Sequence, residues 1–224
     1  MFLDVHTHVP VGDVSPGEPS PGNPSILAIE NRHSHFGEST GSRYVSAGLH
    51  PWYIRPETLA DDFEKLSRYA VQPQVIAIGE CGLDKLTATD WDTQCRAFEW
   101  QIALAEELRK PLVIHCVKAF QECLAFLRET SVPVIFHGVN NRLSLIRPVI
   151  EAGYFLSFGK TLLHPNAAIL DTFRAVPLEQ LFLETDDSPT DIREIYKTAA
   201  RLRNIPEKEI VLQLESNFGK VFKQ

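Results

Sequence analysis

Short continuous runs of apolar residues recur along the whole chain, and they constrain the fold more than any other feature. Each run has the length of a β-strand, and most are rich in Val, Ile, Leu and Phe. The runs are residues 2–5, 26–29, 44–49, 75–78, 112–114, 132–136, 154–158 and 181–183. Strands that lack polar alternation are buried on both faces, as in a parallel sheet covered by helices. The pattern therefore predicts a parallel sheet.

Segments with helical periodicity fill the gaps from the third run onward. The clearest is residues 92–109, where Phe98, Ile102, Ala105 and Leu108 share one face. The expected helices are residues 56–70, 92–109, 118–129, 142–152, 165–175, 190–203 and 207–222. This alternation predicts right-handed βα units, and eight such strands close into a TIM (β/α)8-type barrel of the α/β class.

The first third of the chain departs from this rhythm. Residues 10–24 contain five prolines and three glycines, a composition that no helix tolerates. Residues 31–43 are polar and also contain glycines. We therefore expect loops in place of the first crossover helices, and a barrel that is distorted near the N-terminus. Without a repeat or a linker, the sequence predicts one domain over residues 1–224.

Composition narrows the class of protein. The chain has 224 residues and 44% hydrophobic content, enough for one sizeable core. Its net charge of -7 argues against a broad basic surface for long nucleic acid, but permits a small anionic substrate. Four cysteines without a Cys-x-x-Cys pair indicate reduced thiols. With no signal-like or membrane-spanning run, we expect a cytoplasmic protein with no membrane association.

Polar residues of metal-binding type stand at or just beyond the ends of the apolar runs. The carboxyl ends of parallel barrel strands meet at one rim. Six side chains are therefore expected to converge there on a metal centre. They are His6, His8, Glu80, His115, His137 and Asp186.

His6 and His8 have a spacing that suits a metal clamp. Strand alternation places both imidazoles on one face. Two hydrogen-bonded barrel histidines are the alternative interpretation. His33 and His35 repeat the spacing within a polar stretch, where we interpret the pair as surface residues.

Glu80 shares the parity of Ile76 and Ile78, so it is expected to point into the barrel. A desolvated carboxylate needs a cation or a proton, and a bridging position between two metal ions would satisfy both oxygens. An ion pair with a buried Lys or Arg is the alternative, although the neighbouring runs offer no inward basic residue. Cys116 has the opposite parity to His115, so we expect it to face the helices.

Three acidic residues follow the last apolar run and compete for one role. Glu184 and Asp186 share a face, and Asp187 has the opposite one. We select Asp186 because it lies just beyond the strand, where it can reach a metal-bound water. Asp187 is the main rival, and a solvated acidic loop is the alternative for the whole cluster.

These motifs together resemble the TatD family of metal-dependent deoxyribonucleases, within the amidohydrolase-like group. The likeness covers residues 1–8 and about 44–222. The matching segments are residues 4–8 (DVHTH), 48–51 (GLHP), 77–84 (AIGECGLD), 111–116 (PLVIHC), 137–138 (HG), 183–186 (LETD) and 216–218 (SNF).

The resemblance implies a TIM barrel with a binuclear metal site in which Glu80 is shared. His6, His8 and Asp186 would complete one site, and His115 and His137 the other. Mixed nitrogen and oxygen ligands favour Zn, Mn, Fe or Ni ions, with Mg as an alternative.

Two of these ligands would also be catalytic. Asp186 would act as general base on a water activated by the two ions, and Glu80 would hold them together. His50 and Lys160 lie near the same rim by strand order. Each would either contact substrate or have a structural role.

One departure from the family keeps two enzymatic interpretations open. The family often places Arg two residues after its fifth-strand histidine, where this chain has Val117 and Lys118 after Cys116. The first interpretation is a deoxyribonuclease that cleaves phosphodiester bonds of DNA or a small phosphoester. The second is an amidohydrolase-like hydrolase of a small ester, lactone, amide or phosphoester. A metal-stabilised binding module is the non-enzymatic alternative, and no obligate protein partner is evident.

Overall fold

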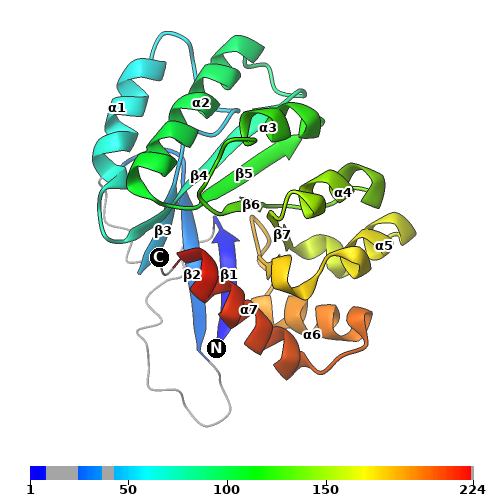
Figure 1. Cartoon of the computed structure of the whole chain (residues 1–224). Coiled ribbons are helices and arrows are strands. Elements are labelled where there is room, and N and C mark those ends of the chain that lie inside the picture. Colours follow the sequence, from blue (N-terminus) through cyan, green and yellow to red (C-terminus); the bar gives the residue numbers. More distant parts are fainter. Residues whose placement is uncertain (9–24, 37–42, 223–224) are drawn as a thin grey trace. The chain divides into compact units, whose positions relative to one another are not determined.

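The computed structural model describes residues 1–8, 25–36 and 43–222, and its strands follow the predicted runs closely (Figure 1). The strands are β1 Phe2–Thr7, β2 Ile26–Arg32, β3 Tyr44–Ala47, β4 Val75–Asp84, β5 Leu112–Val117, β6 Val134–Phe136, β7 Phe155–Phe158 and β8 Leu181–Leu183. They follow chain order through one eight-stranded sheet. The registered pairs β1–β2, β3–β4, β4–β5, β5–β6 and β7–β8 are all parallel.

The predicted helices are also present. They are α1 Leu59–Ala70, α2 Trp91–Leu108, α3 Phe120–Phe126, α4 Leu143–Glu151, α5 Ala167–Ala175, α6 Ile192–Arg203 and α7 Glu207–Phe222. Two short 3-10 helices, η1 Lys160–Leu162 and η2 Leu178–Gln180, were not expected. Eight parallel strands in chain order, with helices following each strand from β3 onward, confirm the TIM-barrel fold class.

The loops expected near the N-terminus are only partly described. Residues 33–36 and 43 contain no helix, as predicted. The Pro-rich stretch 10–24 lies outside the described residues, as do residues 37–42. No helix in the described part of the chain is long and apolar enough to cross a bilayer.

The chain divides into two compact units. Unit 1 draws on the described residues of Met1–Glu30, Thr40–Arg43 and Gly138–Gln224. Unit 2 draws on those of Asn31–Ser39 and Tyr44–His137. The single domain expected over residues 1–224 stays a prediction.

In unit 1, β8 and β1 are joined directly. Thr7 and Asp186 form a parallel bridge, so β7, β8, β1 and the start of β2 are neighbours in that order. Tyr196 of α6 is buried against this group, where its hydroxyl donates to the Leu3 carbonyl and accepts from the Leu3 amide, each at 3.1 Å. Asn217 of α7 donates its side-chain amide to the carbonyl of Leu178 in η2 and to that of Leu181 at the start of β8. Polar side chains therefore attach the C-terminal helices to the strands.

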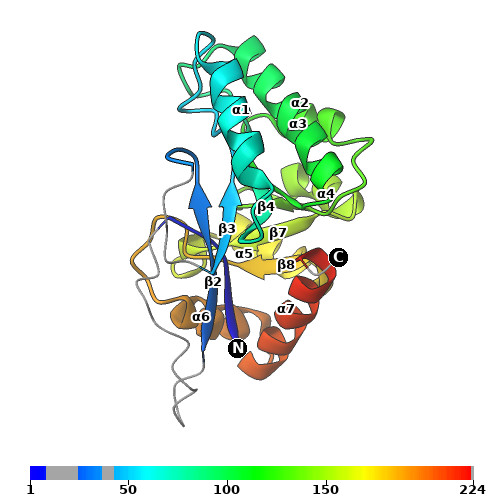
Figure 2. The same ribbon diagram turned by 90° about the vertical axis from the view of Figure 1, so that its left-hand side faces the viewer.

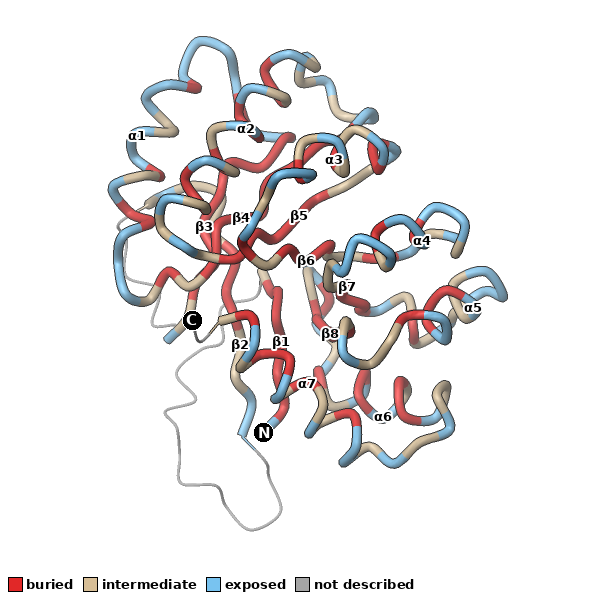
Figure 3. The backbone as a smooth tube through the Cα atoms, viewed as in Figure 1, coloured by how far each residue is buried: buried red, intermediate tan, exposed pale blue. Residues whose placement is uncertain are grey.

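In unit 2, the sheet β3–β6 carries α1, α2 and α3. Figure 2 shows α1 beside α2 on the outer side of β3 and β4. Helix α2 begins where Asp90 accepts from the Thr93 amide, and it ends at Arg109 in the left-handed conformation. Gln101 on its inner face binds both the amide and the carbonyl of Leu49. Strands β3, β4 and β5 are largely buried, as the tube in Figure 3 shows.

Strands β3 and β4 approach each other closely at two glycines. A Cβ at Gly48 would lie 2.6 Å from the Cα of Gly79, well inside van der Waals contact. Gly79 itself has a φ of 143°, a conformation that side chains rarely adopt. This contact immediately precedes Glu80 and therefore helps to set the position of that carboxylate.

We predict that Gly48→Ala destabilises the protein, because its methyl group would overlap the β4 backbone. The expected loss in free energy of unfolding is about 1–3 kcal/mol, measured by urea denaturation. Gly219→Ala in α7 is the matched control, because a Cβ there meets nothing within 4 Å and Ala favours a helix. Equal stability of Gly48→Ala and the wild type would contradict the close approach.

Candidate metal centre

The first candidate group lies in unit 1 and consists of His6, His8 and Asp186. His6 is fully buried in β1, and His8 follows that strand. Their Nε2 atoms lie 3.7 and 3.5 Å from Oδ1 of Asp186. One ligand atom from each residue falls within 4.8 Å of the others. A carboxylate therefore lies beside the two histidines of the predicted His-x-His clamp.

The backbone of β1 holds Asp186 in place. The Asp186 amide donates to the His6 carbonyl, and the His8 amide donates to the Asp186 carbonyl, both at 2.9 Å. Asp186 adopts a left-handed φ of 57°, which is uncommon outside glycine. Next to it, Asp4 accepts from the amide and the hydroxyl of Thr185 at 2.9 and 2.6 Å. Burial raises the pKa of Asp4 to about 7, although the bonds from Thr185 oppose that shift.

The second candidate group lies in unit 2 and is built around Glu80. Its Oε1 atom lies 2.6 Å from Nε2 of His137, 2.7 Å from Nδ1 of His115 and 3.0 Å from Nε2 of His50. The ligand nitrogens of His50 and His115 are 3.3 Å apart. Three imidazoles from β3, β5 and β6 ends thus meet on one carboxylate oxygen of β4.

Electrostatics keep Glu80 ionised despite its burial. Desolvation alone would raise its pKa, but the charge of His137 and hydrogen bonds from the three histidines lower the pKa well below its usual range. Burial lowers the pKa of His50, against the opposing effect of Glu80. An ionised carboxylate and a neutral imidazole are the forms that bind a metal ion.

A further carboxylate and an amide orient this group. Oδ2 of Asp84 lies 3.1 Å from Nε2 of His115 and accepts from the Trp52 indole at 2.6 Å. Burial would raise the pKa of Asp84, but these hydrogen bonds lower it. The side-chain oxygen of Asn31 accepts from the Glu80 amide at 2.9 Å, and its nitrogen lies 3.4 Å from Glu80 Oε2. Such partners fix the ring orientation of a metal-binding histidine.

Both donor sets fit a divalent ion. Imidazole nitrogen with carboxylate oxygen is a ligand combination used for Zn²⁺ and for other first-row transition metals. In unit 2, three ring nitrogens within 3.0 Å of one oxygen form a compact donor cluster. The chemistry of the residues present therefore matches the metal site expected from the sequence.

The structure brings the six predicted ligands together in two sets, one in each unit. His6, His8 and Asp186 form one set, and Glu80, His115 and His137 belong to the other. His50, expected only as a weak substrate contact, joins the second set as a candidate ligand.

The other sequence expectations in this region fall outside the donor sets. Lys160 forms an ion pair with Asp187, whose side chain is 64% exposed. Asp187 therefore faces Lys160, whereas Asp186 faces the histidines. Cys116 lies against Cys123 of α3 and raises the pKa of that thiol, which agrees with its expected orientation toward the helices.

Three supporting residues were missed by the sequence argument. Asp84 has the same parity as Glu80 and lies in the same matched segment, so its position was readable. Asn31 is the penultimate residue of β2, in a stretch that was expected to be a loop. Asp4 precedes the His-x-His pair, and only the fold shows that it binds Thr185.

The chain is similar to known proteins in sequence and in fold. The family model described as TatD related DNase matches residues 32–223. An uncharacterized metal-dependent hydrolase of Buchnera aphidicola is 30% identical over 202 residues, covering 81% of this chain and 76% of that protein. The 3'-5' ssDNA/RNA exonuclease TatD of Erwinia tasmaniensis is 30% identical over 177 residues, covering 75% of this chain and 65% of that protein.

A solved structure supports the fold independently. The TatD homologue YjjV from Escherichia coli superposes with a TM-score of 0.81 at 22% identity, covering 100% of this chain and 98% of that one. Fold and relatives define a metal-dependent hydrolase of the TIM-barrel class. The chain belongs to the TatD-related DNase family, as its motifs predicted.

We predict that Asp84→Ala weakens metal binding by the unit 2 group. Without the carboxylate, the His115 ring loses the contact that orients it, and affinity is expected to fall about 10- to 100-fold. Competition for Zn²⁺ against a chelating dye measures this affinity. Asp92→Ala removes an exposed carboxylate from the same unit and should leave it unchanged. If both variants bind Zn²⁺ like the wild type, Asp84 does not support the group.

Proposed function

We propose that this chain is a divalent-metal-dependent phosphodiesterase whose substrate is single-stranded DNA or a related phosphoester. One observation carries this proposal, namely the three imidazoles of unit 2 that meet on the ionised carboxylate of Glu80. The exonuclease relative supports the choice of nucleic acid. An ion held by several neutral imidazoles and one carboxylate retains positive charge, so it attracts phosphate even to an acidic protein.

Each donor group is proposed to hold one divalent ion, with Zn, Mn, Fe or Ni favoured over Mg. Metal ions held there would supply Lewis-acid polarisation of the phosphoryl group and an acidified water. His6, His8 and Asp186 would hold one, and Glu80, His115 and His137 the other, with His50 as a further donor. The bridging role of Glu80 implied by the family stays a prediction.

Asp186 is proposed as the general base. Its side chain is 29% exposed, so water can reach it, while backbone hydrogen bonds with His6 and His8 fix its position. The carboxylate would accept a proton from the attacking water, and it could return that proton to the leaving oxygen. Lys160 lies in η1 with its charge exposed, and a phosphate contact by Lys160 stays a prediction.

A hydrolase of small esters, lactones or amides is the second candidate. The observation that favours it is the segment after His115, where Lys118 is exposed in a left-handed conformation. The family often has Arg one position earlier, and this chain has Val117. A planar guanidinium can bind phosphate through two parallel hydrogen bonds. Neither Val117 nor Lys118 can form such a pair.

We predict that Asp186→Asn largely keeps the bound metal but lowers kcat by about 10²- to 10⁴-fold, because the amide cannot accept the proton. Elemental analysis and turnover of a labelled single-stranded oligonucleotide measure the two effects. Asp187→Asn is the matched control and should retain most activity. The reverse result, with only Asp187→Asn inactive, would transfer the role to Asp187.

We also predict that His6→Ala and His115→Ala each lose one metal ion per chain while retaining the other. Each removes a ligand from only one of the two groups. Elemental analysis of the purified variants counts the ions, and His164→Ala, which removes an exposed imidazole, should keep both. Retention of the full metal content by both ligand variants would show that the ligands are wrongly assigned.

A further inference from the structure

Two large aromatic side chains are exposed directly beside the candidate metal ligand His50. Trp52 and Tyr53 follow it in the chain and are 52% and 56% exposed. Packing in the hydrophobic core therefore does not account for the presence of these two aromatic residues. Neither residue takes part in the metal chemistry proposed above, although Trp52 binds Asp84.

Both aromatic residues are held in fixed positions. The Trp52 amide donates to Nδ1 of His50 at 3.1 Å, and the Tyr53 amide donates to the His50 carbonyl at 3.0 Å. The edge of the indole is bound by Asp84 at 2.6 Å, as described above. The Tyr53 ring stacks on His33, with centroids 4.5 Å apart and planes inclined by 24°. Rings fixed in this way lose little entropy when a ligand stacks on them.

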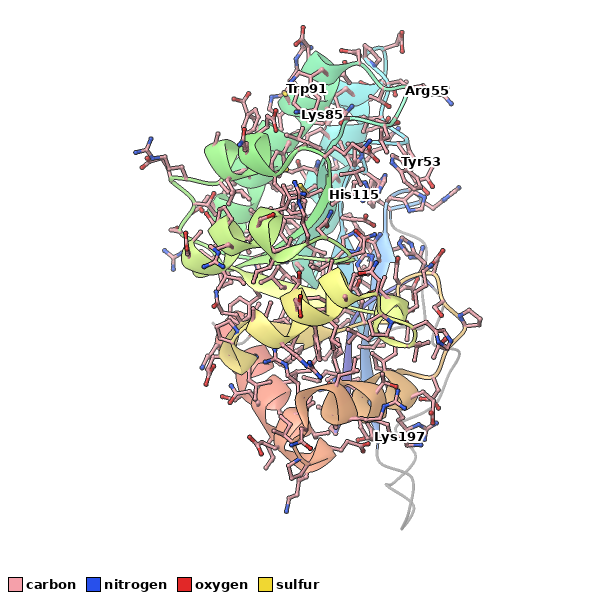
Figure 4. All side chains as sticks on the ribbon, turned by 90° about the vertical axis from the view of Figure 1, so that its right-hand side faces the viewer. Tyr53, Arg55, Lys85, Trp91, His115 and Lys197 are labelled. Atoms are coloured by element: carbon pink, nitrogen blue, oxygen red, sulfur yellow. The ribbon has the colours of Figure 1, made fainter. Side chains whose placement is uncertain are left out.

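The pair lies within reach of the metal ligands. The Trp52 ring is 5.0 Å from the His50 ring and 5.5 Å from the His115 ring. The Tyr53 ring is 5.3 Å from His50. Figure 4 shows Tyr53 and Arg55 on the same side of unit 2, with His115 deeper within that unit. A phosphate held at the histidines would therefore bring an adjoining nucleoside close to these rings.

We propose that Trp52 and Tyr53 form a stacking platform for nucleobases of a single-stranded substrate, an inference that rests on the phosphodiesterase function proposed above. Every base has a π-face, so stacking on aromatic side chains tolerates any sequence. Bases inside a duplex are already stacked on their neighbours, whereas those of a single strand can be splayed onto protein rings.

The net negative charge of the protein also favours binding of the substrate through base stacking. Proteins that hold long nucleic acid through phosphate contacts use basic surfaces. This chain has a net charge of -7, and its exposed Lys85 is paired with Glu122. Aromatic faces beside a metal ion offer affinity that needs no basic groove. Arg55, exposed two residues after Tyr53, adds one local positive charge.

The test compares two substrates on the metal-loaded enzyme. One is an oligothymidylate, and the other has the same backbone with abasic residues at the cleaved end. We expect the wild type to favour the intact chain in kcat/KM by about tenfold or more, the effect of losing a stacked base. Tyr53→Ala and Tyr53→Leu should bring this ratio close to one, while Tyr53→Phe keeps it. Val71→Ala, an exposed apolar residue at the end of α1, is the control and should also keep it.

The outcomes separate the platform from the function on which it rests. A wild type that cleaves both substrates equally would contradict the platform while leaving the phosphodiesterase proposal intact. The same holds if Tyr53→Ala lowers kcat/KM equally for both substrates. A metal-loaded wild type that cleaves neither oligonucleotide contradicts both proposals. Preferential turnover of aromatic esters in that case would assign the rings to a small-molecule substrate.

Discussion

The buried carboxylate of Glu80 is the constraint on which the architecture of unit 2 depends. An ionised carboxylate removed from water is costly unless positive charge or hydrogen bonds compensate it. Here the compensation comes from three histidines, one within β5 and the others just after β3 and β6. The close approach of Gly48 and Gly79 and the amide contact from Asn31 then fix the backbone that carries Glu80. Close backbone packing, hydrogen bonding and electrostatics therefore all act on the position of this carboxylate.

In unit 1, the carboxylate of Asp186 is positioned in a different way. Asp186 is held through its backbone, which bonds to β1 on both sides of Thr7. The side chain remains partly open to solvent, unlike that of Glu80. A buried, multiply bonded carboxylate suits a fixed ligand, whereas a partly exposed one suits proton transfer. This contrast in environment is the physical basis for giving the two residues different roles.

The strand pattern was predictable because continuous apolar runs mark strands buried on both faces. The prediction was wrong for the end of β4. This strand was expected to end at Ile78, but it extends to Asp84. The extension contains Gly, Glu, Cys and Asp. Gln94 of α2 accepts from the Asp84 amide, and His115 of β5 contacts the Glu80 carboxylate. Pairing of β4 with β5 shifts register between Ile78 and Cys81 and then continues to Asp84, so the strand extends beyond the apolar run.

The ligand types were readable from the sequence, but their supporting contacts were not. His-x-His spacing and polar residues at strand ends follow directly from backbone geometry. The contacts of Glu80 and Asp84 depend on which other segments the fold brings next to them. Asn31 of β2 and Trp52 in the turn after β3 lie far from β4 in the sequence and meet it only in the folded chain. The aromatic pair after His50 likewise carries no periodic signal, because it belongs to a turn.

Anomalous diffraction from crystals grown with Mn²⁺ would test the metal assignment most directly. The two donor groups predict two anomalous peaks, one bounded by His6, His8 and Asp186 and the other by Glu80, His115 and His137. The Glu80 carboxylate should contact at least the second peak. A map with metal-loaded crystals, ordered side chains and no anomalous density at either group would contradict the assignment.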